Sequence, residues 1–453
     1  MADISFDHPL LDGYRQPELM AIGDSLFNGV RSLSISAPLA ELSPPAQVAD
    51  AFNWTLITPD YPRPVLFDIE AMFRSGVIDL KDLHAKILAN AGQWMSAAPH
   101  GWSKRRFFDN VSNAGATIGS LFTDTYAKHY PTIDPLVNEV VRTGPLGIQA
   151  KGDLYYALNT AFLLNPAGID ELAFVTPVDL VGLRRPKRLL VNIGSNEGLF
   201  RACLSAKYGD FADSIERIPD LMHELGKALA PHASHVERIY VNSLVRPRCV
   251  GNLWTRADFS EPSPDCVGYF SNYVGRLGFL GGMSGAEMRL FDEHIKDINQ
   301  RAFAAFRAAM PDPSRVHAVD CYALSSRHDR KHDCEAAADE IWVKLRKAKV
   351  RLSNLPLGAL GGFKHGGLFG LDNLHLTGPG SALMAGEIAA VISATEGLPI
   401  PDPIDMQRVT DRDTLLQDIP KMLDLQFFMV GFVAAMLGIF SLVGGNLSAR
   451  ADV

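Results

Sequence analysis

Four short apolar segments, separated by long stretches of helical character, constrain the fold of this chain more than any other feature. The segments have the length and composition of β-strands, and they are residues 18–24, 188–193, 236–244 and 316–322. Three helical patterns accompany them at residues 218–230, 286–310 and 380–394. Strands and helices that alternate at this spacing predict an α/β fold with a central parallel sheet and helices on both faces.

The composition limits the classes of protein to which this chain can belong. Of its 453 residues, 47% are hydrophobic and 21% are charged, which is typical of a globular protein with a substantial core. The formal net charge is -8, whereas a dedicated nucleic-acid binder has a basic surplus, so we expect no nucleic-acid partner. Five scattered cysteines, an odd number, imply no disulfide framework and favour a reducing compartment.

The sequence divides into a large domain and a different C-terminal part. Residues 1–397 contain the alternating pattern, which long segments at 36–106, 122–186 and 245–283 interrupt; these could form a pocket or a lid. Residues 398–426 begin with a proline-rich stretch, which predicts the end of the globular part and a linker.

Residues 427–445 are apolar and uncharged, and their length is close to the ~20 residues that a membrane-spanning helix needs. The N-terminal segment contains acids and prolines but no apolar run, so it does not predict a secretory signal. Together these features predict membrane contact through a C-terminal helix, with the preceding domain in the cytoplasm. The alternative is a soluble cytoplasmic protein that buries this helix in an oligomer interface or against its own pocket.

Gly23-Asp24-Ser25-Leu26 follows the first predicted strand at the point where a helix should begin. Side chains at the carboxyl edge of a parallel sheet converge on an open crevice. A serine at a helix N-terminus is also surrounded by free backbone N–H groups, which favour developing negative charge. Ser25 is therefore a candidate nucleophile, and the alternative is that it only caps the helix.

Asp372 precedes His375 by three residues, just before the last helical pattern. A histidine that takes a proton from a serine needs a carboxylate to hold its ring in one tautomer, and Asp372 suits this role if both residues share a loop. Two further residues, Gly115 and Asn196, lie in glycine-containing segments near strand ends, where a backbone N–H and a side-chain amide could stabilise an oxyanion. The alternative for both is an ordinary turn, since glycine and asparagine suit turns in any protein.

The four motifs occur in one order along the chain, and in this order the sequence resembles the SGNH hydrolases, also called the GDSL lipase/esterase family. The resemblance spans residues 18–394 and implies a three-layer α/β/α sandwich around the parallel sheet. It implies a catalytic triad of Ser25 as nucleophile, His375 as base and Asp372 as the orienting carboxylate. It also implies an oxyanion hole made by the N–H groups of Ser25 and Gly115 and the amide of Asn196.

Two positions depart from the family pattern. The third block of the family has aspartate after its asparagine, whereas this chain has Glu197, and the longer acid could shift the loop. The family often has proline after the catalytic histidine, whereas this chain has Leu376. We expect these changes to affect loop geometry and not the roles of the catalytic residues.

The resemblance implies a serine ester hydrolase that cleaves carboxylic esters through an acyl-enzyme on Ser25, with no cofactor and no metal. The expected substrate is a small-molecule or lipid-like ester. A carbohydrate O-acetylesterase and an acyltransferase of the same family stay open, because both use the same triad. The alternative from another class is a catalytically silent, membrane-anchored binding protein, and the oligomeric state also stays open.

Two other patterns are set aside. The sequence around Ser284 resembles a nucleophile elbow, but Ala286 replaces the second glycine that such an elbow requires. His328 and His332 have a spacing that can bind zinc on a helix, yet the charged residues around them favour a solvated loop.

Overall fold

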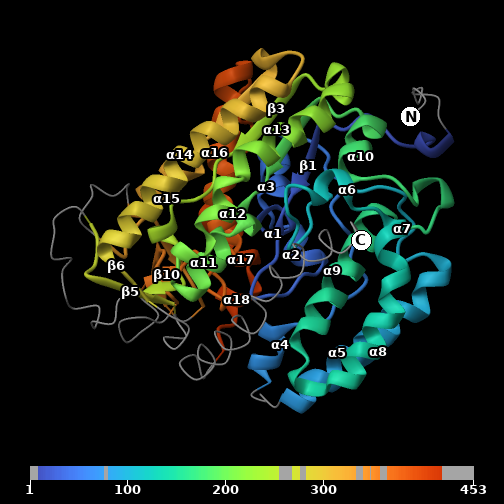
Figure 1. Cartoon of the computed structure of the whole chain (residues 1–453), viewed down its shortest axis with the longest axis horizontal. Coiled ribbons are helices and arrows are strands. Elements are labelled where there is room, and N and C mark those ends of the chain that lie inside the picture. The colour runs from blue at the N-terminus through green and yellow to red at the C-terminus, as the bar shows by residue number, and fades with distance from the viewer. Residues whose placement is uncertain are drawn as a thin grey trace.

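The computed structural model describes residues 9–75, 80–254, 268–275, 282–332, 340–346, 348–357 and 365–420. At its centre lies a parallel sheet of four strands in the order β1-β2-β3-β7 (Figure 1). The strands are β1 (Leu19–Gly23), β2 (Arg188–Asn192), β3 (Arg238–Asn242) and β7 (Val316–Val319). Each strand lies within one of the four apolar segments, so the predicted α/β class and central parallel sheet are confirmed.

A fifth extended segment pairs with β1 at the edge of the sheet. The N–H of Ala21 donates to the carbonyl of Asp109 at 2.8 Å, and the N–H of Val111 donates to the carbonyl of Ala21 at 2.9 Å. Further along, the N–H of Asn113 donates to the carbonyl of Gly23 at 2.9 Å. This pairing brings the loop that follows Asn113 to the carboxyl end of β1.

Helices cover both faces of the sheet. Consecutive side chains of a strand point to opposite faces, and in β3 the hydroxyl of Tyr240 donates to Glu396, at the end of α16 (Gly378–Glu396), at 2.6 Å. The next residue, Val241, instead lines a cavity with Met222 of α13 (Ile218–Leu229) and Ala302 of α14 (Gly285–Ala309). Helices α13 and α14 pack on each other, and α3 (Pro44–Ala51) packs on α16 (Figure 1). The three predicted helices correspond to α13, α14 and α16 and are confirmed.

The long segments that interrupt the alternation are structured where they are described. The first two are mainly helical, and α5 (Leu80–Ala97), α8 (Ile133–Thr143) and α9 (Ile148–Leu164) lie together at one end of the molecule (Figure 1). Trp94 of α5 packs edge to face against Phe162 of α9 and against Trp102, which lies in the loop after α5. The third segment contributes to a small antiparallel sheet of β4 (Leu253–Trp254), β5 (Asn272–Gly275) and β6 (Gly282–Ser284).

The other α-helices of the described residues are short. They are α1 (Ser25–Asn28), α2 (Ala37–Ala40), α4 (Ile69–Arg74), α6 (Ser120–Thr123), α7 (Tyr126–His129), α10 (Pro177–Arg184), α11 (Leu199–Ser205), α12 (Ala212–Glu216), α15 (Cys321–Arg327), α17 (Met406–Arg412) and α18 (Thr414–Gln417). A second small sheet contains β8 (Trp342–Lys344), β9 (Lys349–Ser353) and β10 (His365–Gly367) in the order β10-β9-β8.

Part of the predicted linker packs on the domain. Residues 398–420 are described, and they form α17 and α18 after the proline-rich stretch. Leu415 and Leu416 are buried, and the fully buried Asp413 forms an ion pair with Arg31 at 2.8 Å. The globular part therefore extends beyond residue 397, whereas the sequence predicts that it ends there.

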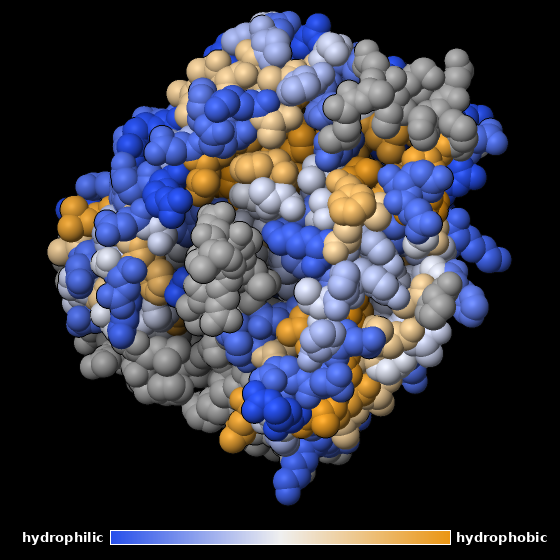
Figure 2. All heavy atoms as spheres, turned by 45° about the vertical axis from the view of Figure 1, so that its right-hand side comes forward, coloured by the Kyte–Doolittle hydropathy of each residue, from blue (hydrophilic) through white to orange (hydrophobic). Residues whose placement is uncertain are grey.

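The apolar tail predicted at residues 427–445 lies outside the described residues. Within the described ranges, no helix is long and apolar enough to cross a membrane. Figure 2 shows hydrophilic residues over much of one face, with smaller hydrophobic areas between them. The large apolar side chains that are exposed on the described part are Val141, Leu146, Phe174, Leu290 and Trp342, and exposed apolar residues of this kind are normal on a folded domain.

Candidate active site

The turn after β1 places Ser25 at the start of a helix. Asp24 is the N-cap of α1, and its carboxylate accepts a hydrogen bond from the N–H of Leu26 at 3.1 Å. Ser25 is the first helical residue, and the first N–H groups of a helix have no acceptor within it. Gly23 permits the close approach of β2, because a Cβ there would lie 2.2 Å from the carbonyl oxygen of Asn192. The predicted position of Ser25 is confirmed, but the capping role belongs to Asp24.

Ser25, His375 and Asp372 form a hydrogen-bonded chain. Nε2 of His375 lies 3.0 Å from Oγ of Ser25, and Nδ1 of the same ring lies 2.7 Å from Oδ2 of Asp372. All three residues are buried. A carboxylate can only accept hydrogen bonds, so Nδ1 carries the ring hydrogen and Nε2 is left to accept the proton of the serine hydroxyl. In this arrangement a histidine can activate a serine.

The carboxylate of Asp372 is held by backbone groups as well as by the histidine ring. Its Oδ1 accepts from the N–H groups of Leu374 and His375, each at 3.0 Å, and its Oδ2 accepts from the N–H of Leu33 at 3.0 Å. Burial alone would raise the pKa of Asp372, but the neighbouring His375 and the N–H donors outweigh burial and lower the pKa below its usual range. Asp372 is therefore an ionised, fixed acceptor for the ring.

Gly115 and Asn196 lie together at the same edge of the sheet. Nδ2 of Asn196 donates to the carbonyl of Ala116 at 2.8 Å. Gly115 has a φ of +87°, a left-handed conformation that glycine adopts without strain, and its N–H meets no acceptor among the described residues. Asn113 ties this loop to the end of β1. The two residues are thus brought to the end of the strand that precedes Ser25, although no hydrogen bond within the described part joins either of them to Ser25.

Two carboxyl groups in these motifs have raised pKa values. Burial raises the pKa of Asp24 to about 6, although backbone donation and a hydrogen bond from Asn192 at 2.9 Å act in the opposite direction. Burial likewise raises the pKa of Glu197 to about 7, even though its Oε1 accepts from the N–H of Ile118 at 2.5 Å. The longer acid at position 197 therefore has a direct structural role, because it holds the loop that follows Gly115.

A buried amide network, which the sequence analysis missed, connects α1 with the loop of Gly115. Nδ2 of Asn159 in α9 donates to Oδ1 of Asn113 at 2.6 Å and to Oδ1 of Asn28 at 3.3 Å. The hydroxyl of Tyr61 donates to Oδ1 of Asn159 at 2.8 Å and accepts from Nδ2 of Asn28 at 2.9 Å. Tyr61 and Asn159 come from the first two inserted segments, so these segments supply hydrogen bonds to the site.

A second buried cluster centres on Arg31. Its guanidinium pairs with Glu70 at 2.7 Å and with Asp413 at 2.8 Å. Asp413 also accepts from the first N–H of α16 at 2.7 Å. Two residues after Arg31, the N–H of Leu33 holds the carboxylate of Asp372. The cluster thereby links the C-terminal helices to the segment after α1 and to the loop that contains Asp372 and His375.

The two patterns set aside in the sequence have structural roles. Ser284 caps α14 in a reciprocal capping box with Glu287. The solvated loop expected around His332 is wrong, because Asp329 and His332 are buried and Nδ1 of His332 lies 2.8 Å from Oδ2 of Asp329. Nε2 of His332 lies 2.8 Å from the hydroxyl of Tyr273, so both ring nitrogens have partners. No group of three or more potential metal ligands occurs among the described residues.

Comparison of the chain with models of protein families, with curated proteins and with solved structures finds no match.

Proposed function

We propose that the chain is a serine ester hydrolase of the SGNH type, which cleaves carboxylic esters through an acyl-enzyme on Ser25. The observation that supports this most strongly is the hydrogen-bonded chain from Asp372 through His375 to Ser25. Such a chain activates a serine hydroxyl, which is otherwise a weak nucleophile. Ser25 also lies at the start of α1, where backbone N–H groups have no acceptor within the helix, and at the carboxyl edge of the parallel sheet, where α/β proteins bind ligands.

In the proposed mechanism, Ser25 attacks the ester carbonyl while His375 takes the proton of its hydroxyl. The N–H groups of Ser25 and Gly115 and the amide of Asn196 stabilise the oxyanion. His375 then gives the proton to the leaving alcohol, and the acyl group stays on Ser25. Water deprotonated by His375 releases the acid and regenerates the serine. His375 makes every proton transfer in this mechanism, so the proposal requires no cofactor and no metal.

Covalent labelling with a fluorophosphonate is the experiment that tests the proposal, because this reagent reacts with activated serines. We expect the label on Ser25, located by mass spectrometry of the labelled peptide. The label should be absent in Ser25→Ala and strongly reduced in His375→Ala. Ser284→Ala is the matched control and should keep the label, because Ser284 is the rival serine and caps α14. A folded protein that takes no label with or without detergent would refute the hydrolase and favour the binding protein.

The location of the protein is a separate part of the proposal. Residues 427–445 would hold the chain at a membrane, with the catalytic domain in the cytoplasm. Fractionation of cell extracts tests this by comparing the full chain with a chain that ends at Leu425. We expect the full chain in the membrane pellet and the shortened chain in the supernatant. If the two chains distribute in the same way between pellet and supernatant, the membrane contact is refuted.

A further inference from the structure

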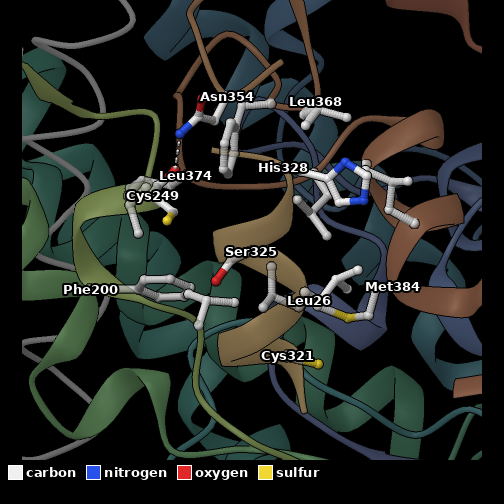
Figure 3. A pocket seen from close by; sticks show the side chains of 17 residues that line it. Leu26, Phe200, Cys249, Cys321, Ser325, His328, Asn354, Leu368, Leu374 and Met384 are labelled. Atoms are coloured by element: carbon white, nitrogen blue, oxygen red, sulfur yellow. Dashed lines mark hydrogen bonds between the residues drawn. The ribbon is translucent and has the colours of Figure 1, made fainter. Parts of the chain in front are cut away.

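A cavity beside the histidine of the proposed triad has no part in the mechanism described so far. It has a volume of about 80 Å³. Its walls come from α11, α15, the first turns of α16, the loop that contains His375 and the loop after β3 (Figure 3). These elements lie at the carboxyl edge of the sheet, which is also the edge where Ser25 begins α1.

The walls of the cavity include the immediate neighbours of the proposed catalytic residues. Leu26 follows the nucleophile in α1, and Leu374 and Leu376 flank His375 in the chain. Phe200 of α11 meets the ring of His375 edge to face, with the ring centroids 6.1 Å apart. A group that occupies the cavity therefore packs next to the histidine that transfers the proton.

The described residues that line the cavity offer hydrocarbon contacts and no charged group. Leu324 of α15 and Leu383 of α16 contribute apolar wall, and most of the other lining residues are also apolar. The amide of Asn354 already donates to Asp329 at 2.8 Å and to a backbone carbonyl at 3.1 Å. Burial lowers the pKa of His328 to about 4, so this ring is neutral near neutral pH. A polar ligand would lose its hydrogen bonds to water here and gain few in return.

We propose that the cavity receives a short hydrocarbon chain of the ester substrate, of roughly three or four carbons. An engineered apolar cavity of about 150 Å³ holds benzene, so a cavity of about 80 Å³ has room for about half as many carbons. This inference rests on the proposed hydrolase function. It narrows the expected substrate from lipid-like esters in general to short-chain esters, and it disfavours a sugar at this position.

Two series of esters test the inference and show which side of the ester occupies the cavity. In the first series the acyl chain grows from about two to about ten carbons on one alcohol, and in the second the alcohol chain grows on acetate. Burial of each methylene should raise kcat/KM about fourfold until the cavity is full. We expect one series to peak near four carbons, which identifies the occupant as acyl or alcohol. A flat dependence in both series, or a steady rise to about ten carbons, would overturn the inference.

Variants of the wall provide the second part of the test. Leu383 is half-buried, and Leu383→Trp should fill the cavity. This variant should lower the ratio of kcat/KM for four-carbon over two-carbon esters about 15-fold, which is the effect of two methylenes. Val391→Trp is the matched control, because Val391 is also half-buried in α16 but lies outside the cavity, and it should keep the wild-type ratio. Leu324→Ala enlarges the cavity and should move the optimum to longer chains.

The outcomes separate the two proposals. Absence of fluorophosphonate label on Ser25 would refute the hydrolase itself. Label on Ser25, together with a wild-type ratio in Leu383→Trp and a wild-type optimum in Leu324→Ala, would overturn only the role of the cavity.

Discussion

Asp24 allows a direct test of the electrostatics at the start of α1. Its Oδ1 accepts from the N–H of Leu26 at 3.1 Å and from Nδ2 of Asn192 at 2.9 Å, whereas its buried Oδ2 has no hydrogen-bond partner among the described residues. Asparagine keeps the Oδ1 acceptor and is an equally good N-cap, but it cannot ionise. Asp24→Asn therefore removes the titration of this group and preserves its contacts.

The size of the expected change in the free energy of unfolding follows from the pKa of Asp24, which burial raises from 3.8 to about 6. Between these two values the folded chain keeps a proton that the unfolded chain has released, so the wild-type protein loses stability as the pH rises. The loss is about 1.4 kcal/mol per pH unit and about 3 kcal/mol in all. About 2 kcal/mol of it falls between about pH 4.5 and about pH 7. Asp24→Asn lacks this pH-dependent loss of stability, because asparagine does not titrate.

Urea denaturation at a series of pH values measures the effect as the free energy of unfolding of Asp24→Asn minus that of the wild type. Titrating groups that the two proteins share cancel in this difference. We expect the difference to rise by about 2 kcal/mol between about pH 4.5 and about pH 7, whatever its value at acidic pH. Glu197→Gln is a companion variant whose difference should rise mainly at higher pH, because the pKa of Glu197 is about 7. A difference for Asp24→Asn that stays constant or falls as the pH rises would refute the reasoning, since Asp24 would then be ionised throughout.

Three further substitutions test other parts of the site. Asn196→Ala should lower kcat about 10²–10³-fold in an ester assay because one oxyanion donor is lost, and a normal kcat would exclude that role. Asn159→Leu should lower the free energy of unfolding by about 3 kcal/mol, since it leaves several buried partners unpaired at about 1–3 kcal/mol each, and an unchanged urea midpoint would contradict this. Asp413→Ala should cost about 3–5 kcal/mol in the same assay, because it removes one partner from the buried charge of Arg31. Asp418→Ala is its control and should cost less than about 1 kcal/mol, because Asp418 is exposed, and equal costs for the two variants would argue against the buried pair.

The central sheet could be predicted from the sequence because each of its strands is a local apolar run bounded by turn residues. The pairing of residues 109–113 with β1 could not be predicted, since this extended segment is too short to show a recognisable pattern. The C-terminal helices were missed for a different reason. Prolines after residue 397 correctly indicate a break in regular structure, but the burial of Asp413 depends on Arg31, which lies far earlier in the chain.

The hydrogen-bonded chain of the site could be predicted because its members belong to short motifs whose order along the chain resembles that of a known family. The buried amide side chains that support this hydrogen-bonded chain could not be predicted. Asn28 lies one turn after Ser25, but nothing in the sequence relates it to Tyr61 or Asn159. The burial of Asp329 was missed because a cluster of charged residues indicates solvent unless the pairs that neutralise it are known.

The inserted segments have a role that their sequences do not reveal. They supply buried hydrogen-bond partners to α1 and to the loop of Gly115, through Tyr61 and Asn159. An unpaired buried polar group costs about 1–3 kcal/mol, which is a large share of the roughly 5–15 kcal/mol that stabilises a domain. Any displacement of α1 from this loop must therefore break hydrogen bonds that water cannot replace. Removal of these partners should reduce stability and activity together. Asn196→Ala should instead lower activity about 10²–10³-fold with a smaller loss of stability, because it leaves only the carbonyl of Ala116 without its donor.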